Sequence, residues 1–169
     1  MEQLWAPWRM QFIEELRDRG SGCVFCELHG DAEGGDDRGR LVLHRAGKCY
    51  VLMNRFPYNN GHLMVIPYAH TGSLSGLDAE TRAEVMSLCS ASVEILGQAL
   101  GAEGFNCGFN IGKSAGAGIV DHVHLHVVPR WCGDANFLPI IGKTRSMPEY
   151  LSATYDRLRP GFEKLGGMK

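Results

Sequence analysis

The chain has 169 residues, of which 44% are hydrophobic and 21% charged, and its formal net charge is −2. These proportions are those of an ordinary globular protein and exclude wholesale disorder, a collagen-like fibre and a coiled coil. Because the net charge is small, neither a nucleic-acid polymer nor an acidic membrane surface is expected as the main partner. No apolar run reaches the ~18 residues of a transmembrane helix, and the first ten residues lack the apolar segment of a signal peptide. We therefore expect one cytoplasmic domain over residues 1–169.

The predicted elements begin with a short amphipathic helix over residues 10–18, followed by a tight knuckle at residues 22–26. Residues 29–40 are rich in Gly and Asp and lack apolar periodicity, which predicts a mobile loop. Short apolar runs separated by turn residues then predict three antiparallel strands. These strands are expected at residues 41–43, 49–53 and 62–66.

A long helix is predicted from Asp78, which can cap it, to about Leu100, because apolar residues recur between them at helical spacing. Gly101 and Gly104 are expected to end this helix. The remaining elements are strands at residues 105–111 and 122–128 and a helix at residues 148–158, stopped by Pro160 and Gly161. Together these elements predict an α+β fold, a five-stranded antiparallel sheet with one long helix and further helices at both termini.

Three histidines alternate with apolar residues in the segment His122-Val-His-Leu-His-Val-Val128. Because side chains on a strand alternate between its faces, His122, His124 and His126 are expected in a row on one face, roughly 7 Å apart. Such a row is poor core packing, since each imidazole brings polar nitrogens that need partners. A solvated histidine-rich strand, an adventitious metal site and a reactive row of imidazoles are the open interpretations.

A glycine-rich loop, residues 112–118, directly precedes this strand. Backbone N–H groups in such loops can form a nest that binds phosphate, although a loop of this kind is more often a plain connection. Next to the histidines, it suggests a phosphate held beside an imidazole. An imidazole can attack phosphorus and form a covalent intermediate, which divides one difficult displacement into two easier ones.

The pair Cys23-Val-Phe-Cys26 is half of a zinc site and needs two more ligands, because no second CxxC pair exists in the chain. The histidines outside the triad that can contribute are His29, His44, His62 and His70, with His122 as a further candidate. A degenerate knuckle without metal is the alternative, and a redox pair is disfavoured because no βαβ context surrounds it. His62 itself is expected to be a hydrogen-bonded structural histidine.

The segment His122–Val128 resembles the His-φ-His-φ-His-φ-φ signature of the histidine triad (HIT) superfamily of nucleotide hydrolases and transferases. Residues 51–54 and 61–67 are similar to the nucleotide-side strands of that superfamily, and the resemblance covers about residues 22–131. Within the superfamily, the flanks are similar to bacterial diadenosine tetraphosphate phosphorylases. The flanking segments are residues 4–9, 114–118 and 129–137.

This resemblance implies that His124 is the nucleophile that attacks an α-phosphate, and that His126 contacts the phosphate and the bridging oxygen. It also implies that Asn54 binds the ribose hydroxyls. The phosphate-binding segment implied by the resemblance is Asn110, Ser114, Gly116, Ala117 and Gly118. The nucleophile needs a neutral nitrogen, with its other ring nitrogen held by an acceptor such as a backbone carbonyl. Developing phosphate charge calls for N–H donors and for a cationic His126.

Trp131 directly follows the triad strand, where it can stack on a nucleobase or pack at the strand end. Members of the superfamily with a CxxC pair imply a structural zinc held by Cys23, Cys26, His70 and His122. The resemblance further implies a homodimer, and no organic cofactor is expected.

The activity implied is cleavage of a dinucleoside polyphosphate through a nucleotidyl-histidine, with transfer to inorganic phosphate, as in a diadenosine tetraphosphate phosphorylase. The glycine-rich loop is one residue longer than in the fragile-histidine-triad hydrolases, and Gly118 and Ile119 stand where those hydrolases have a glutamine. This departure favours phosphate over water as the acceptor. The alternatives are a hydrolase of dinucleoside polyphosphates or nucleoside phosphoramidates, and a nucleotide- or zinc-binding interaction protein without turnover.

Overall fold

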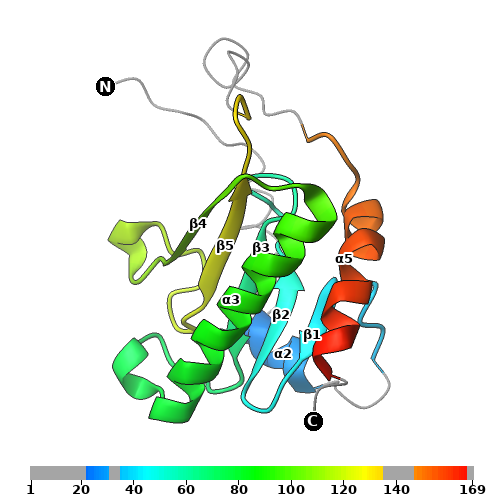
Figure 1. Ribbon diagram of the computed structural model, residues 1–169. Helices are drawn as coiled ribbons and strands as arrows, with labels where there is room; N and C mark the ends of the chain where they lie inside the picture. Colours follow the sequence, from blue (N-terminus) through cyan, green and yellow to red (C-terminus); the bar gives the residue numbers. More distant parts are fainter. Residues whose placement is uncertain (1–21, 31–34, 135–146, 167–169) are drawn as a thin grey trace, which may run out of the picture.

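The computed structural model describes residues 22–30, 35–134 and 147–166, so the helix predicted over residues 10–18 lies outside the described residues. Its centre is a five-stranded sheet of order β1-β2-β3-β5-β4, in which every neighbouring pair is antiparallel (Figure 1). The strands are β1 Val42–Arg45, β2 Cys49–Met53, β3 Leu63–Pro67, β4 Gly104–Phe109 and β5 Leu125–Arg130. The helices are α2 Val24–Gly30, α3 Ala79–Leu100 and α5 Leu151–Gly166, with short 3-10 turns η1 Leu74–Gly76 and η2 Lys113–Ala115. The predicted fold class is therefore confirmed.

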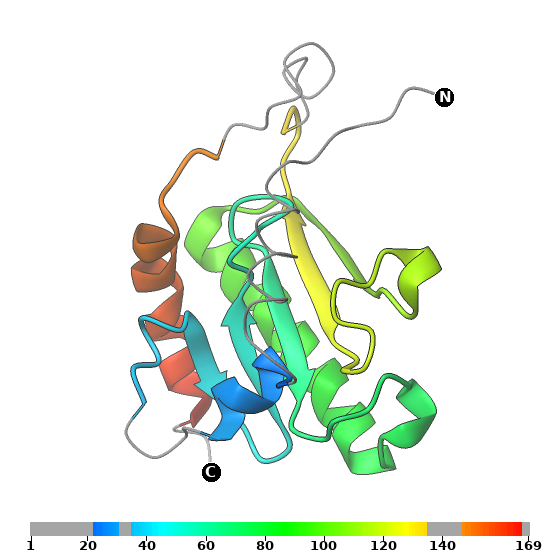
Figure 2. The same cartoon turned by 180° about the vertical axis from the view of Figure 1, so that it is seen from behind.

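The two faces of the sheet bury separate apolar clusters, as the strand alternation requires. One face packs against α3 and α5 through a large cluster that includes Val51, Leu96 and Phe162. The opposite face packs against α2 through a smaller cluster that includes Phe25 and Met64 (Figure 2). None of the described helices is long and apolar enough to span a membrane.

Helix α3 begins after Asp78 and ends at Gly101 as predicted, whereas Gly104 is the first residue of β4. The Asp78 carboxylate accepts a hydrogen bond from the Thr81 N–H group, which satisfies one free donor of the first turn. Gly101 closes the helix in the left-handed region, at φ 64°, where glycine has no steric cost. This long helix covers the sheet face opposite α2.

The CxxC segment runs into a helix directly after Cys23, which corrects the predicted knuckle at residues 22–26. Helix α2 begins at Val24, and the Glu27 N–H group donates to the Cys23 carbonyl at 3.0 Å. The same helix continues to Gly30, so the first residues of the predicted loop at 29–40 are helical as well. The apolar ring of Phe25 is buried against the sheet, and this packing stabilises a helix too short to form alone.

The last helix does not stop at Pro160 and Gly161, and that prediction is wrong. Helix α5 continues to Gly166, because its buried residues Tyr155, Leu158 and Phe162 form one stripe on both sides of the proline. A proline in a helix interior costs about 3 kcal/mol. Burying each of these large side chains contributes roughly 1.5–3 kcal/mol and offsets that cost.

Gly161 allows α5 to approach α3 closely rather than ending α5. A Cβ atom at this position would lie 2.7 Å from Cγ2 of Ile95, which is closer than real Cβ contacts. The glycine therefore serves the packing of the two helices.

The histidine strand begins later than predicted. Strand β5 starts at Leu125, opposite Val65, so His122 and His124 precede the ladder. The reason is that the Val123 N–H group donates to the Thr71 carbonyl at 2.7 Å, outside the sheet. Strand register places His126 opposite Met64, on the face covered by α2.

Candidate functional site

The three histidines are buried, with exposed fractions of 0% for His122, 5% for His124 and 8% for His126. This burial excludes the solvated histidine-rich strand. The rings of His124 and His126 are closer than the strand spacing predicted, with centroids 4.8 Å apart in an edge-to-face arrangement. Buried imidazoles need hydrogen-bond partners, and those partners fix which ring nitrogen carries the proton.

His124 presents a free ring nitrogen. Its Nδ1 atom lies 2.8 Å from the His122 carbonyl oxygen. Because a carbonyl only accepts, Nδ1 carries the proton and the lone pair is on Nε2. Burial lowers the pKa of His124, against a smaller upward effect of the carbonyl hydrogen bond. The result is a neutral imidazole with an available Nε2, as expected for a nucleophile held by a backbone carbonyl.

His62 is a member of the site that the sequence indicated only as a structural histidine. Its Nδ1 atom accepts from the Tyr58 backbone N–H group at 3.0 Å, and the Asn54 amide lies 3.3 Å from the same atom. A backbone N–H group can only donate, so the proton of neutral His62 is on Nε2. That Nε2 atom lies 3.0 Å from Nδ1 of His126 and donates to it. The prediction that His62 is a hydrogen-bonded structural histidine is correct, and the group to which His62 donates belongs to the triad.

This chain of hydrogen bonds also fixes which ring nitrogen of His126 carries the proton. Since Nδ1 of His126 accepts from His62, its own proton is on Nε2, which faces the side-chain amide of Asn110 at 3.4 Å. Rotation of that amide exchanges its oxygen and nitrogen, so its oxygen can accept from Nε2. Burial lowers the pKa of His62 to about 3 and that of His126 to about 4, and neighbouring imidazoles add to both effects. His126 is thus a neutral N–H donor, whereas the sequence suggested a cationic one.

The two predicted asparagines flank the histidine pair. Asn54 lies beside His62, and its Oδ1 atom also accepts from the Phe56 N–H group at 2.9 Å. Asn110 follows β4 and reaches His126 from the other side. The structure therefore brings both residues to the histidines, while their contacts with ribose and phosphate stay predictions.

The glycine-rich loop forms one 3-10 turn, with Gly112 at φ 81° and Gly116 at φ 84°. The N–H groups of Gly116 and Ala117 donate inside this turn, to the carbonyls of Lys113 and Gly112. Ser114 and Gly118 are exposed. Phosphate binding by Ser114, Gly116, Ala117 and Gly118 stays a prediction, and two of these N–H groups already have partners.

Trp131 lies at the far end of β5 from His124. Its indole Nε1–H group donates to the Leu100 carbonyl, 3.4 Å away, at the end of α3. Seven residues of extended chain span on the order of 20 Å. This placement fits packing at the strand end, and stacking on a base stays a prediction.

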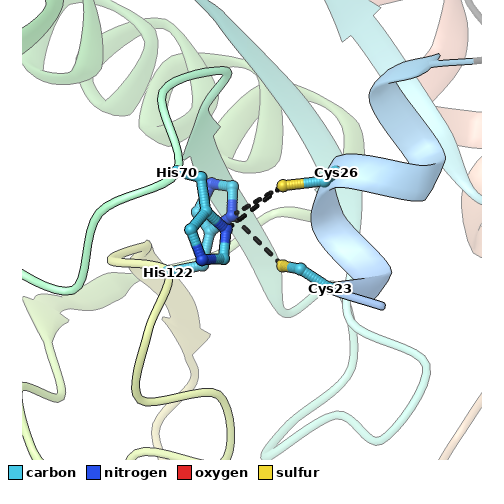
Figure 3. A group of neighbouring side chains, drawn as sticks. All are labelled: Cys23, Cys26, His70 and His122. Atoms are coloured by element: carbon cyan, nitrogen blue, oxygen red, sulfur yellow. Dashed lines mark hydrogen bonds between the residues drawn. The ribbon is translucent and has the colours of Figure 1, made fainter. Parts of the chain in front are cut away.

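The four predicted metal ligands come together from three segments (Figure 3). Their ligand atoms all lie within 4.8 Å of one another, and they belong to Cys23, Cys26, His70 and His122. Cys26 Sγ lies 3.2 Å from Nδ1 of His70, and Cys23 Sγ lies 3.3 Å from Nδ1 of His122.

This cluster fits a metal ion. The Nε2 atom of His122 donates to the Pro67 carbonyl at 2.8 Å, so its Nδ1 lone pair faces the sulfurs. Burial raises the pKa of the Cys26 thiol, and a hydrogen bond with Cys23 adds to this effect. Two sulfur and two imidazole ligands form the donor set that zinc prefers in closed tetrahedral sites.

The depressed pKa values predict that acid weakens the fold before the carboxylates titrate. An unfolded histidine has a pKa near 6.5, whereas His62 and His126 stay neutral in the native state down to about pH 4 and below. The unfolded chain therefore binds more protons, so stability is lost as the pH falls from about 6.5 to about 4.

Urea unfolding midpoints measured between pH 7 and pH 4 check this expectation. The midpoint is expected to decrease across the window, with a shallower decrease in His62→Gln. Equal slopes in the two proteins would contradict the role assigned to His62.

The comparisons with known proteins agree with this geometry. The HIT domain family matches residues 39–132, more than half of the chain. The AP-4-A phosphorylase of Mycobacterium tuberculosis is 37% identical over 157 residues, which covers 91% of this chain and 80% of that protein.

Two solved structures share the fold. A Zn-bound histidine triad family protein from Mycobacterium smegmatis has a TM-score of 0.68 and 27% identity, and covers 88% of this chain and 98% of its own. A hypothetical histidine triad nucleotide-binding protein from Sulfolobus tokodaii has a TM-score of 0.66 and 26% identity, over 85% of this chain and 93% of its own. With a buried histidine triad that leads into β5 of the five-stranded sheet, this chain belongs to the histidine triad (HIT) superfamily.

Proposed function

We propose that this protein is a nucleotidyl transferase that cleaves dinucleoside polyphosphates through a covalent nucleotidyl-His124 intermediate. The observation that carries the proposal is the hydrogen bond from Nδ1 of His124 to the His122 carbonyl, which leaves the Nε2 lone pair free. Membership of the HIT superfamily and the likeness to an AP-4-A phosphorylase support the substrate class.

In the first step, Nε2 of His124 attacks the α-phosphorus, and the bond from phosphorus to the bridging oxygen breaks. The Nε2–H group of His126 donates a hydrogen bond to that oxygen as negative charge develops on it. The leaving group is itself a phosphate, whose second pKa is about 6, so it departs without needing a full proton. The neutral donor form of His126 is therefore sufficient for this step.

In the second step, an acceptor oxygen attacks the same phosphorus, and the bond to Nε2 of His124 breaks. We infer that the acceptor is inorganic phosphate, so that diadenosine tetraphosphate yields ADP and ATP. Gly118 and Ile119, which stand where the fragile-histidine-triad hydrolases have a glutamine, support this choice, as does the name of the 37% identical relative. Phosphate brings its own nucleophilic oxygen, so this step requires no base to deprotonate water.

Product analysis with diadenosine tetraphosphate tests the acceptor. With inorganic phosphate present, ADP and ATP are expected in equal amounts.

The His124→Asn variant is expected to lose at least about 1,000-fold in turnover while retaining substrate binding, because the nucleophile is gone. His44→Asn is the matched control, since His44 lies on β1 against Phe162, away from the site.

The other outcomes separate the alternatives. Phosphate-independent formation of AMP and ATP would identify water as the acceptor and a hydrolase as the correct assignment. Nucleotide binding without turnover on polyphosphates or phosphoramidates would support an interaction protein. Substantial turnover by His124→Asn would exclude the covalent intermediate.

We further propose that Cys23, Cys26, His70 and His122 bind one structural zinc ion per chain. Bound there, the ion ties α2 to the segments after β3 and before β5, and it takes no part in the chemical steps. The convergence of the four ligand atoms supports this assignment, as does the Zn-bound relative from Mycobacterium smegmatis. No organic cofactor is required by the proposed reaction.

Metal content and melting temperature test the zinc site. Purified protein is expected to contain one zinc per chain, and Cys26→Ser is expected to lose the metal and melt at a lower temperature. Cys132→Ser, which changes an exposed free cysteine elsewhere, is expected to retain both properties. Zinc retained at full occupancy in Cys26→Ser would disprove the ligand set.

We propose a homodimer in which two copies pair along β4. The other sheet edge, β1, is covered by α5, where Arg159 and Tyr155 donate to the Leu43 and Val42 carbonyls. Strand β4 instead exposes its central residues 106–108. Within the described part of the chain no strand pairs with the outer side of β4, and such an edge offers backbone groups to a second strand.

Light scattering is expected to give twice the chain mass of 18.6 kDa. Cys107→Lys places a charge on the β4 edge and is expected to shift the mass toward the monomer, whereas Cys132→Lys is not. A dimer unaffected by Cys107→Lys would place the interface elsewhere.

We assign the protein to the cytoplasm, where its six free cysteines would stay reduced.

A further inference from the structure

Phe25, between the two cysteines of the metal cluster, touches the nucleophile. Its ring centroid lies 5.0 Å from that of His124 at an interplanar angle of 61°, and 5.4 Å from that of His122 at 80°. Both contacts are edge-to-face, which is a favoured geometry for aromatic rings. On the basis of the nucleotidyl transfer proposed above, we infer that Phe25 is a positioning residue that holds the His124 ring in its attacking orientation.

His124 needs such support because its backbone lies outside the sheet. It precedes β5, and among the described residues its ring makes one hydrogen bond, from Nδ1 to the His122 carbonyl. That bond fixes the tautomer but still allows the ring to tilt. The ring of His126 packs edge-to-face on the His124 ring, with centroids 4.8 Å apart, and Phe25 provides a second aromatic contact. The two contacts together limit the tilt.

Phe25 is itself held in place by its own helix. The Tyr50 hydroxyl donates to the Phe25 carbonyl at 2.8 Å, in the buried layer between α2 and the sheet. Cys23 and Cys26 flank the ring in sequence and reach His70 and His122 with their sulfur atoms. Any metal that joins these four groups therefore also fixes Phe25 relative to His124. The metal cluster and the nucleophile are coupled through this ring and through His122.

The burial of Phe25 separates this role from substrate binding. Its side chain is 4% exposed, so it has no free face on which a nucleobase could stack. A residue that only positions the nucleophile changes kcat and leaves KM nearly constant, whereas a residue that contacts the substrate equally in ground and transition states changes KM.

The test compares Phe25→Leu with Phe162→Leu. Both changes remove a buried ring, but Phe162 lies in the large cluster on the opposite sheet face. Because misplacing a reacting atom by about 1 Å can cost up to 100-fold, we expect Phe25→Leu to lower kcat about tenfold with KM changed less than twofold. We expect its zinc content to stay at the wild-type level. Phe162→Leu is expected to lower the melting temperature and to leave kcat unchanged.

A spectroscopic readout keeps the inference independent of the proposed reaction. In ¹⁵N NMR of the imidazoles, the His124 signals are expected to shift in Phe25→Leu and to stay in place in Phe162→Leu. Removal of zinc by a chelator is expected to move the same signals in wild type, and to move them less in Phe25→Leu, where the link through His122 remains. If no nucleotide is turned over but these shifts appear, the positioning role stands and the proposed function fails.

Two results would overturn the inference. One is a kcat in Phe25→Leu equal to that of Phe162→Leu, together with unshifted His124 signals. The other is a rise in KM with kcat unchanged, which would make Phe25 a substrate contact.

Discussion

The site depends on the departure of residues 122–124 from the sheet just before β5 begins. The Val123 N–H group bonds to the Thr71 carbonyl instead of to a neighbouring strand. This frees the His122 carbonyl to accept from Nδ1 of His124, which fixes the tautomer of the proposed nucleophile. In a regular ladder, that carbonyl would serve a backbone donor, and the imidazole would need another acceptor.

His122 joins two sites that are distinct in chemistry. Its side chain donates from Nε2 to the Pro67 carbonyl and turns Nδ1 toward the sulfurs, while its backbone carbonyl holds His124. The residue thus links a cluster suited to metal with the nucleophile, without offering its own ring to a substrate. Phe25 makes a second link between the same two sites through ring contacts.

The three triad histidines and His62 remain neutral because they are buried, and each ring has a hydrogen-bond partner in place of water. Unpartnered polar nitrogens in such a position would cost about 1–3 kcal/mol each. Here a single backbone donor, the Tyr58 N–H group, sets the proton positions on His62 and then on His126. A change at His62 is therefore transmitted to the group proposed to meet the leaving oxygen.

The sequence by itself determined the sheet, the long helix and the CxxC half of a metal site, because these depend on local periodicity and residue chemistry. Asp78 and Gly101 mark the ends of α3 through capping and backbone preferences that need no tertiary contact. The three histidines alternate with Val123, Leu125 and Val127. This alternation likewise predicted that one face of the segment carries the reactive side chains and that the other face packs in the core. The ligands for metal were proposed from a resemblance, and the fold brings them together.

Only the tertiary structure decided the details that depend on contacts between distant segments. Pro160 and Gly161 stop a helix by local rules, yet packing of α5 on α3 continues it to Gly166. His62 became a member of the site through the register of β3 on β5, which no local pattern encodes. The protonated nitrogen of each imidazole follows from partners up to 64 residues away in the chain. Sequence fixes which groups are available, whereas the folded contacts set their orientation and proton positions.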